Sequence, residues 1–339
     1  MTSFNLSYGS FLLFRLLEGK LDALFAMGNV MRKDVDKCHC VMDNLPLGDA
    51  SDKITQGCLV LEGGAFRALY GVGVLDAFMQ HDLNFSCVVG VSAGAMSGLS
   101  YVSGQIGRSV RIDLLYRHDP RYVGHKALLQ EKGIIGFRFF AEGMDEIGDI
   151  PKFNFDRFHS GRQKLIPVAT NCETGESEFF EYEQYLDVCQ AIKASASMPF
   201  VSKMVDVGGK LCLDGGCSCR VPVHWAIEHG FEKIVVVRTR DLTYRKQKPS
   251  RLYKAISKAF YHKYPKFEDD VIHMGTRYNK LCDEMEQLHK SGRIYMLAPK
   301  TPVTVGRMEP SLQKLRALYD QGYREASEQV DAIHQYLNK

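Results

Sequence analysis

The sequence predicts an α/β fold in which helices sandwich a mainly parallel sheet, with a helical region at the C-terminal end. Between residues 56 and 240, short apolar runs alternate with segments of helical periodicity, which is the pattern of βαβ units. After residue 241 the pattern is helical apart from one strand-like run, RIYMLAP at 293–299. The 339 residues suffice for one large α/β core with an appendage, or for two modest domains.

These changes of pattern divide the chain into three expected regions. Residues 1–55 form an N-terminal extension, which has no strand-like run and ends in turn formers and charges. Within it, FLLFRLLEGKLDALFAM at 11–27 is predicted to be an amphipathic helix, because charged residues interrupt its apolar run. Residues 56–240 form the α/β domain, and residues 241–339 form the mostly helical C-terminal region.

The elements of the α/β domain are expected in a definite order. Apolar runs at 58–62, 86–90 and 164–171 predict buried strands, and each of the first two is followed by a helix. A turn at 173–176 leads into another strand, and a helix from residue 186 ends before Pro199. Residues 204–216 predict a hairpin about Gly208 and Gly209. Pro222 fits the first turn of a helix, and KIVVVRTR at 233–240 predicts a central strand.

Composition excludes several classes of function. A net charge of +3 is too small to indicate a nucleic-acid partner. Several of the ten cysteines lie in apolar runs, which indicates reduced, buried thiols and a cytoplasmic protein. The C-x-C pairs at 38–40 and 217–219 lack the spacing of zinc sites, so we expect no metal and no organic cofactor. No apolar run is long enough to span a bilayer.

The most informative motif is CVVGVSAGAMSG at 87–98. Gly90, Ser92 and Gly94 form G-x-S-x-G between an apolar strand and a helix of small residues. A sharp turn of this kind needs residues without bulk on both sides and exposes the serine oxygen near a helix N-terminus. Ser92 is therefore the candidate nucleophile.

A second glycine-rich turn follows the first predicted strand, in EGGAFRALYGVG at 62–73. Gly63, Gly64 and Ala65 could turn their backbone N–H groups toward Ser92 and stabilise an oxyanion. A phosphate-binding loop is the alternative, but neither G-K-[ST] nor a regular G-x-G-x-x-G stands at Gly63.

The base that takes the serine proton is expected to be Asp214. It ends the strand in LCLDGGCS, and Gly215 and Gly216 let the backbone turn tightly after it. A histidine is the alternative, but none of the histidines after Ser92 lies in a segment typical of a catalytic loop. A hairpin turn without catalytic function is the other interpretation of the Asp-Gly pair.

Together these motifs resemble those of the patatin-like phospholipase family. The resemblance rests on Gly63-Gly64-Ala65-Phe66-Arg67, on the elbow around Ser92 and on Asp214-Gly215-Gly216, in the family's order, over about residues 57–240. ASASMPF at 194–200 also looks like the family's serine-rich turn. The resemblance implies that Ser92 and Asp214 form a Ser-Asp dyad and that the loop at 63–65, with Arg67, is the oxyanion loop. Ala65 and Ala68 depart from the family's glycines, so either their backbone angles are ordinary or the loop is distorted.

The expected function is that of a lipid acyl hydrolase, acting on phospholipid or lysophospholipid esters through an acyl-enzyme. Two alternatives stay open: a Ser-His-Asp carboxylesterase, and a lipid-binding regulatory protein with little activity.

The stretch at 244–267 carries eight Lys and Arg residues and no acidic residue. Leu252, Ile256 and Phe260 recur at helical spacing and are expected either to dock a solvated basic helix on the core or to lie in an anionic membrane surface. The second interpretation places the protein peripherally at the inner membrane surface.

Overall fold

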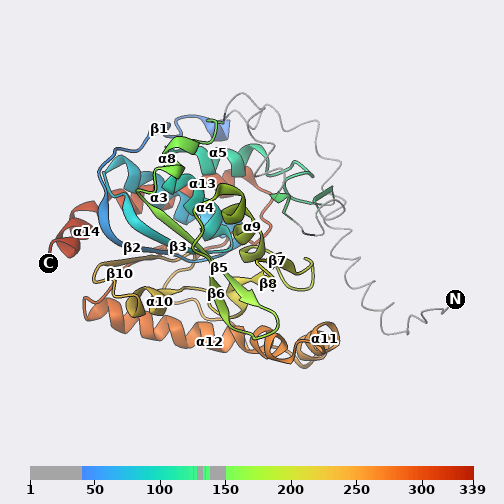
Figure 1. Ribbon diagram of the computed structural model, residues 1–339. Helices are drawn as coiled ribbons and strands as arrows, with labels where there is room; N and C mark the ends of the chain where they lie inside the picture. Colours follow the sequence, from blue (N-terminus) through green and yellow to red (C-terminus); the bar gives the residue numbers. More distant parts are fainter. Residues whose placement is uncertain (1–39, 125, 128–132, 134, 138–149) are drawn as a thin grey trace.

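The structure, a computed structural model, describes residues 40–339 apart from 125, 128–132, 134 and 138–149 (Figure 1). In this part of the chain an eight-stranded sheet has the order β10-β9-β2-β3-β5-β8-β7, with β6 paired to β5. The strands from β10 to β5 pair in parallel, and β6, β7 and β8 are antiparallel. The strands are β2 (Thr55–Leu61), β3 (Phe85–Val91), β5 (Lys164–Asn171), β6 (Ser177–Phe179), β7 (Val205–Val207), β8 (Lys210–Asp214), β9 (Ile234–Val237) and β10 (Tyr295–Leu297). The predicted mainly parallel sheet is confirmed.

Helices cover both faces of the sheet (Figure 1). One face packs against α3 (Leu69–Gln80), α4 (Ala93–Val102), α5 (Arg108–Leu115), α9 (Tyr185–Ser195) and α13 (Leu312–Ser327). The other packs against α10 (Val223–Glu228) and α12 (Pro265–Lys290). Because both faces are covered, the central strands are apolar throughout, and all four residues of β9 are buried. Gly208 and Gly209 both have positive φ in the turn between β7 and β8, as the predicted hairpin requires.

In the sequence, the apolar residues from Leu312 to Leu337 recur at a continuous 3.6-residue spacing, which predicts one last helix, but in the structure they belong to two helices. The chain turns at Glu328 and Gln329, where Gln329 N–H donates to Ala326 O, and α14 (Val330–Leu337) begins. This turn places Tyr336 against the start of β9, where its hydroxyl accepts from Ile234 N–H and donates to Arg293 O. Periodicity cannot detect such a bend, because the apolar stripe resumes after it.

The basic helix α11 (Arg251–Tyr261) docks by a different face from the predicted one. Leu252 and Phe260 are 61% and 43% exposed, so the expected docking stripe points largely away from the core. Tyr253 and Tyr261 face inward instead, and the ring of Tyr261 packs edge-on against Phe267. The stripe through Tyr253 and Tyr261 lies one residue after the predicted stripe and has the same four-residue spacing. The contacts of Tyr261 with Phe200 and Phe267 determine that this stripe faces the core.

Residues 1–39, which include the helix predicted at 11–27, lie outside the described residues. Val41, Leu45 and Ala50 are buried in the main core, and Arg111 donates to the carbonyl oxygens of Leu45 and Pro46. The predicted boundaries at residues 55 and 240 stay predictions. Among the helices that are described, none has the length and apolarity to cross a membrane.

Candidate active site

Ser92 lies on a sharp turn between β3 and α4, as predicted. Its φ of 56° and ψ of −123° form a conformation that a non-glycine residue rarely adopts. A Cβ on Gly90 would stand 2.8 Å from Ala95 N, and one on Gly94 would stand 2.8 Å from Leu61 O. Both glycines are therefore needed for the close approach of backbone around Ser92. A strained turn that exposes a serine at a helix start is typical of a nucleophile.

The loop after β2 lies directly against this turn. A Cβ on Gly63 would stand 3.0 Å from Ser92 Cβ and 2.8 Å from Val91 O. Thr239 Oγ1 donates to Gly63 O at 3.3 Å, and the buried Arg67 donates from Nε to Gly64 O at 3.2 Å. These hydrogen bonds hold the loop by the carbonyl groups of Gly63 and Gly64. Ala65, the next residue, lines the same pocket as Ser92. The predicted loop is thus brought to the serine.

The two alanines that depart from the family's glycines behave differently. Ala68 has φ −64°, an ordinary helical value. Ala65 has φ +50°, in the left-handed region, where an alanine costs about 1 kcal/mol relative to a glycine. The loop therefore keeps a glycine-like backbone at Ala65 at some expense of stability.

Asp214 ends β8, on the opposite side of β5 from Ser92. Val91, which precedes the serine, pairs with Val168 of β5, and the next residue of β5, Ala169, pairs with Asp214. With strands about 4.8 Å apart, the Cα atoms of Ser92 and Asp214 are roughly 10 Å apart, and their side chains share one end of β5. Asp214 Oδ1 accepts from Gly216 N–H at 2.7 Å.

The last residue of α9 and the turn that follows it contact Ser92 and Asp214. Ser195 Oγ accepts from Ser92 N–H at 2.8 Å and donates to Val168 O. Ser197 O accepts from Asp214 N–H at 2.8 Å. Two residues of the predicted serine-rich turn therefore tie the nucleophile candidate and the base candidate to each other. The sequence indicates the turn but not these contacts, of which the one between Ser92 and Ser195 joins residues 103 positions apart.

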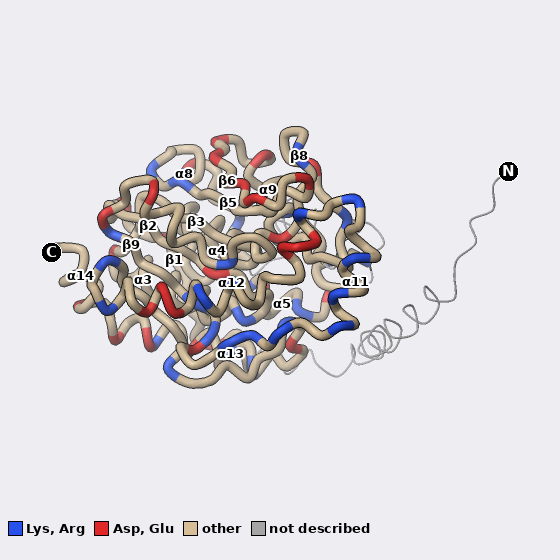
Figure 2. Tube along the Cα trace, turned by 90° about the horizontal axis from the view of Figure 1, so that it is seen from below, with Lys and Arg blue, Asp and Glu red and all other residues tan. Residues whose placement is uncertain are grey.

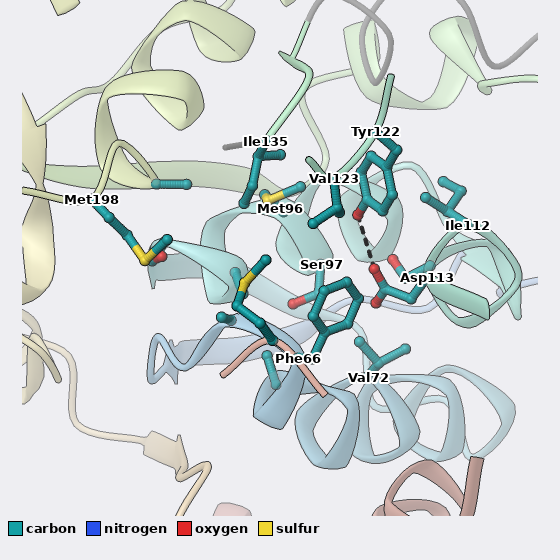
Figure 3. Close-up of a pocket in the computed structure, with 17 residues that line it drawn as sticks. Phe66, Val72, Met96, Ser97, Ile112, Asp113, Tyr122, Val123, Ile135 and Met198 are labelled. Carbon is teal, nitrogen blue, oxygen red and sulfur yellow. Dashed lines mark hydrogen bonds between the residues drawn. The ribbon is translucent and has the colours of Figure 1, made fainter. Parts of the chain in front are cut away.

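An apolar pocket of about 700 Å³, part of it open to solvent, extends from Ser92 between α4, α5 and the loop after β2 (Figure 3). Its floor carries one polar pair, because Tyr122 Oη donates to Asp113 Oδ1 at 2.9 Å. Burial raises the pKa of Asp113 to about 7, although Tyr122 and Arg117 oppose the shift. The remaining lining includes Phe66, Val72, Met96, Ile112, Val123, Ile135, Met198 and Met308. The mostly apolar lining suits an acyl chain.

The predicted alternative base, a histidine, has no contact with the serine in the described part of the chain. No described histidine hydrogen-bonds to Ser92 or lines its pocket, and His125 lies outside the described residues. His224 is 3.6 Å from Glu284, and His229 contacts Trp225 O, both on the far side of the sheet.

The serine-rich turn also connects the site to α11. It ends at Phe200, whose φ of +71° is again unusual and whose N–H donates to Tyr261 Oη at 2.7 Å. The ring of Phe200 packs against Tyr253, Phe260 and Tyr261. One short segment thus contacts Ser92, Asp214 and the basic helix.

Two family models and several known proteins match parts of this chain. The model of the patatin-like phospholipase family matches residues 59–227, and that of a domain of unknown function, DUF6363, matches residues 264–338. The uncharacterized protein YjjU of Escherichia coli (strain K12) is 26% identical over 272 residues, 76% of this chain and 72% of that protein. The probable lipid hydrolase 463L of Invertebrate iridescent virus 6 is 26% identical over 209 residues, 55% of this chain and 71% of that protein. The crystal structure of VipD from Legionella pneumophila aligns with 85% of this chain and 70% of its own, with a TM-score of 0.40 and 12% identity.

Proposed function

Because residues 59–227 make this chain a member of the patatin-like phospholipase family, we propose that it hydrolyses lipid acyl esters with Ser92 as nucleophile and Asp214 as base. The observation that carries the proposal is the meeting of three segments at one end of β5. The strained elbow presents Ser92, the loop at 63–65 lies against it, and the serine-rich turn holds both Ser92 and Asp214.

The reaction follows from these positions. Ser92 Oγ attacks the ester carbonyl while Asp214 takes its proton, and the backbone N–H groups of residues 63–65 stabilise the tetrahedral oxyanion. When the intermediate collapses, the alcohol leaves with the proton from Asp214, and the acyl group stays on Ser92. Water then attacks the acyl-enzyme, gives its proton to Asp214, and the carboxylic acid is released as Ser92 Oγ is reprotonated.

The substrate is a phospholipid or lysophospholipid. The apolar pocket beside Ser92 takes the acyl chain, and its open end leaves room for the rest of the lipid.

The helix α11 attaches the enzyme to anionic lipid at the inner membrane surface. Its docked face leaves Leu252 and Phe260 exposed next to Lys254, Lys258 and other basic residues, and Figure 2 shows Lys and Arg gathered along this helix. Each basic residue near an anionic surface contributes about 1 kcal/mol, so four facing it together give roughly 4 kcal/mol, enough for reversible attachment. Phe200, at the end of the serine-rich turn, contacts Tyr253 and Phe260, so attachment through α11 brings the proposed active site to the lipid.

Vesicle sedimentation tests the attachment. The variant with Lys254→Glu, Lys258→Glu and Lys263→Glu should lose binding to anionic vesicles, and wild-type binding should weaken as salt rises. The single change Lys254→Glu is compared with Lys290→Glu, at the far end of α12, which alters the net charge by the same amount outside this surface. Equal binding by the triple variant, or binding indifferent to salt and lipid charge, would refute the proposal.

Release of fatty acid from phospholipid and lysophospholipid tests the activity. Wild type should release it, and Ser92→Ala should not. Loss of activity on substitution of a histidine would favour the Ser-His-Asp esterase, and lipid binding without hydrolysis would favour the regulatory protein.

A further inference from the structure

Four cationic side chains gather beside Asp214, outside the apolar pocket. Arg220 approaches Asp214 over Gly216, which has no side chain. A Cβ on Gly216 would stand 3.1 Å from Arg220 Nη2 and 2.9 Å from Asp214 Oδ1, so both groups lie on the same side of this glycine. Arg220 and Lys246 share the ring of Tyr278, with their charged groups 5.8 and 4.8 Å from its centroid. The charge of Arg307 acts on Lys246 and, together with the charges of Arg240 and Arg220, on Arg67, so Arg240 and Arg307 belong to the same group.

Arg240 and Arg307 also connect the cluster to the oxyanion loop. The Arg307 carbonyl accepts from Phe66 N–H, next to Ala65, and the charges of both Arg240 and Arg307 act on Arg67 of the same loop. The cluster of Arg220, Arg240, Lys246 and Arg307 therefore borders both Asp214 and the loop against Ser92.

The members of this cluster have no carboxylate partner within 4 Å in the described part of the chain. Neighbouring cations do: Arg245 Nη2 lies 2.6 Å from Asp283 and 3.0 Å from Glu286, and Arg277 Nη2 lies 2.6 Å from Asp270. Lys246 Nζ and Arg220 Nε are buried without a hydrogen-bond partner among the same residues. Buried polar and charged groups in proteins are normally paired, so the unpaired Lys246 Nζ and Arg220 Nε beside the candidate site indicate an anionic ligand.

Electrostatics agree with the geometry. Burial, followed by the charges of Arg220 and Arg307, lowers the pKa of Lys246 to about 6. Burial, followed by the charges of Arg240, Arg307 and Arg220, lowers the pKa of Arg67 to about 10. The Lys246 amine is therefore largely neutral at pH 7 in the free protein, and a bound anion would relieve the repulsion and favour its ammonium form.

We propose that Arg220, Arg240, Lys246 and Arg307 bind a phosphate group of the substrate, so that the enzyme prefers acyl esters that carry a terminal phosphate. The inference rests on the proposed function. Guanidinium groups bind phosphate oxygens in pairs, and an ammonium adds a point charge. With the acyl chain in the apolar pocket and the phosphate on this cluster, the ester lies between them at Ser92. A choline group on the phosphate would add a positive charge next to the cations and is disfavoured.

Three soluble esters with the same octanoyl chain test the preference. These are octanoyl lysophosphatidate, octanoyl lysophosphatidylcholine and monooctanoylglycerol, each used as a monomer. We expect wild-type kcat/KM to be at least about tenfold higher for the lysophosphatidate than for either of the others, since charge-assisted hydrogen bonds are strong. Lys246→Met and Arg307→Gln should each reduce that ratio severalfold to tenfold. Lys248→Met is the control. It replaces an exposed lysine two residues after Lys246 by the same residue type and should leave the ratio unchanged.

The outcomes separate this inference from the proposed function. Equal kcat/KM for the three esters, or an unchanged ratio in Arg307→Gln, would overturn the phosphate subsite while hydrolysis itself stood. Arg307 is exposed, so Arg307→Gln should fold normally. It therefore tests the phosphate subsite even if Lys246→Met fails to fold. If wild type hydrolyses none of the esters, the proposed function fails, and calorimetry with glycerol 3-phosphate and inorganic phosphate tests the cluster. Binding of glycerol 3-phosphate that Arg307→Gln weakens would support a head-group site; no binding, or equal binding of inorganic phosphate alone, would overturn it.

Discussion

The carboxyl group of Asp113 at the floor of the apolar pocket should make the protein less stable as pH rises through neutrality. Burial raises its pKa to about 7, whereas an unfolded aspartate has a pKa of about 4. Between these two values the folded state holds a proton that the unfolded state has released. The free energy of unfolding therefore falls as pH increases from about 4 to about 7, and it levels off above the folded pKa.

The pKa difference sets the size of the effect. One pKa unit corresponds to about 1.4 kcal/mol, so a difference of about 3 is worth about 4 kcal/mol at most. Asn at this position carries no titrating proton, and its Oδ1 can still accept from the Tyr122 hydroxyl. We expect Asp113→Asn to match wild type near pH 4 and to be more stable than wild type at pH 8. Asp76, whose pKa burial also raises to about 7, keeps part of the pH dependence in the variant.

Urea unfolding at several pH values between 4 and 8 measures this difference. The control is Asp119→Asn, because hydrogen bonds and the charge of Arg121 outweigh burial and lower the pKa of Asp119. That variant should lose stability at neutral pH rather than gain it. If Asp113→Asn and wild type unfold with the same pH dependence, the pocket floor does not hold a neutral carboxyl group.

Three further predictions concern the loop and the N-terminal region. Ala65→Gly should raise the free energy of unfolding by about 1 kcal/mol, measured by urea unfolding, because it relieves the positive φ; an unchanged or lower value would show that the loop is unstrained. Gly64→Val should lower kcat by about 10²–10³ with the fold retained by circular dichroism, because its Cβ would meet Thr239 Oγ1 at 2.7 Å and displace the loop; unaltered kcat would remove the loop from the mechanism. A protein that begins at Met42 should fold and hydrolyse a short acyl ester, since β2 and β3 lie beyond that residue, and insolubility would show that the segment before it is needed.

Local sequence patterns predict most of the sheet and the sharp turn at Ser92. Ser92 could be found because small residues on both sides of a serine, between a strand and a helix, have few explanations other than a sharp turn. The β5 strand was predicted with its observed limits because its apolar run is uninterrupted and is followed by turn residues.

Features that depend on contacts between distant segments could not be predicted. The docked face of α11 depends on Phe200 and Phe267, and two stripes of equal spacing compete on that helix. The cationic cluster joins Arg220, Lys246 and Arg307, which look like ordinary surface residues in the sequence. Only the fold shows that they meet beside Asp214 and lack carboxylate partners among the described residues.

Labelling with a fluorophosphonate, followed by mass spectrometry of the adduct, tests the central claim most directly. We predict that the phosphonyl group is on Ser92, and that Asp214→Asn slows labelling by about 10²–10⁴ with little change in the thermal midpoint, because it removes the base that takes the serine proton. An adduct on another serine, or labelling of Ser92 at the wild-type rate in Asp214→Asn, would contradict the account.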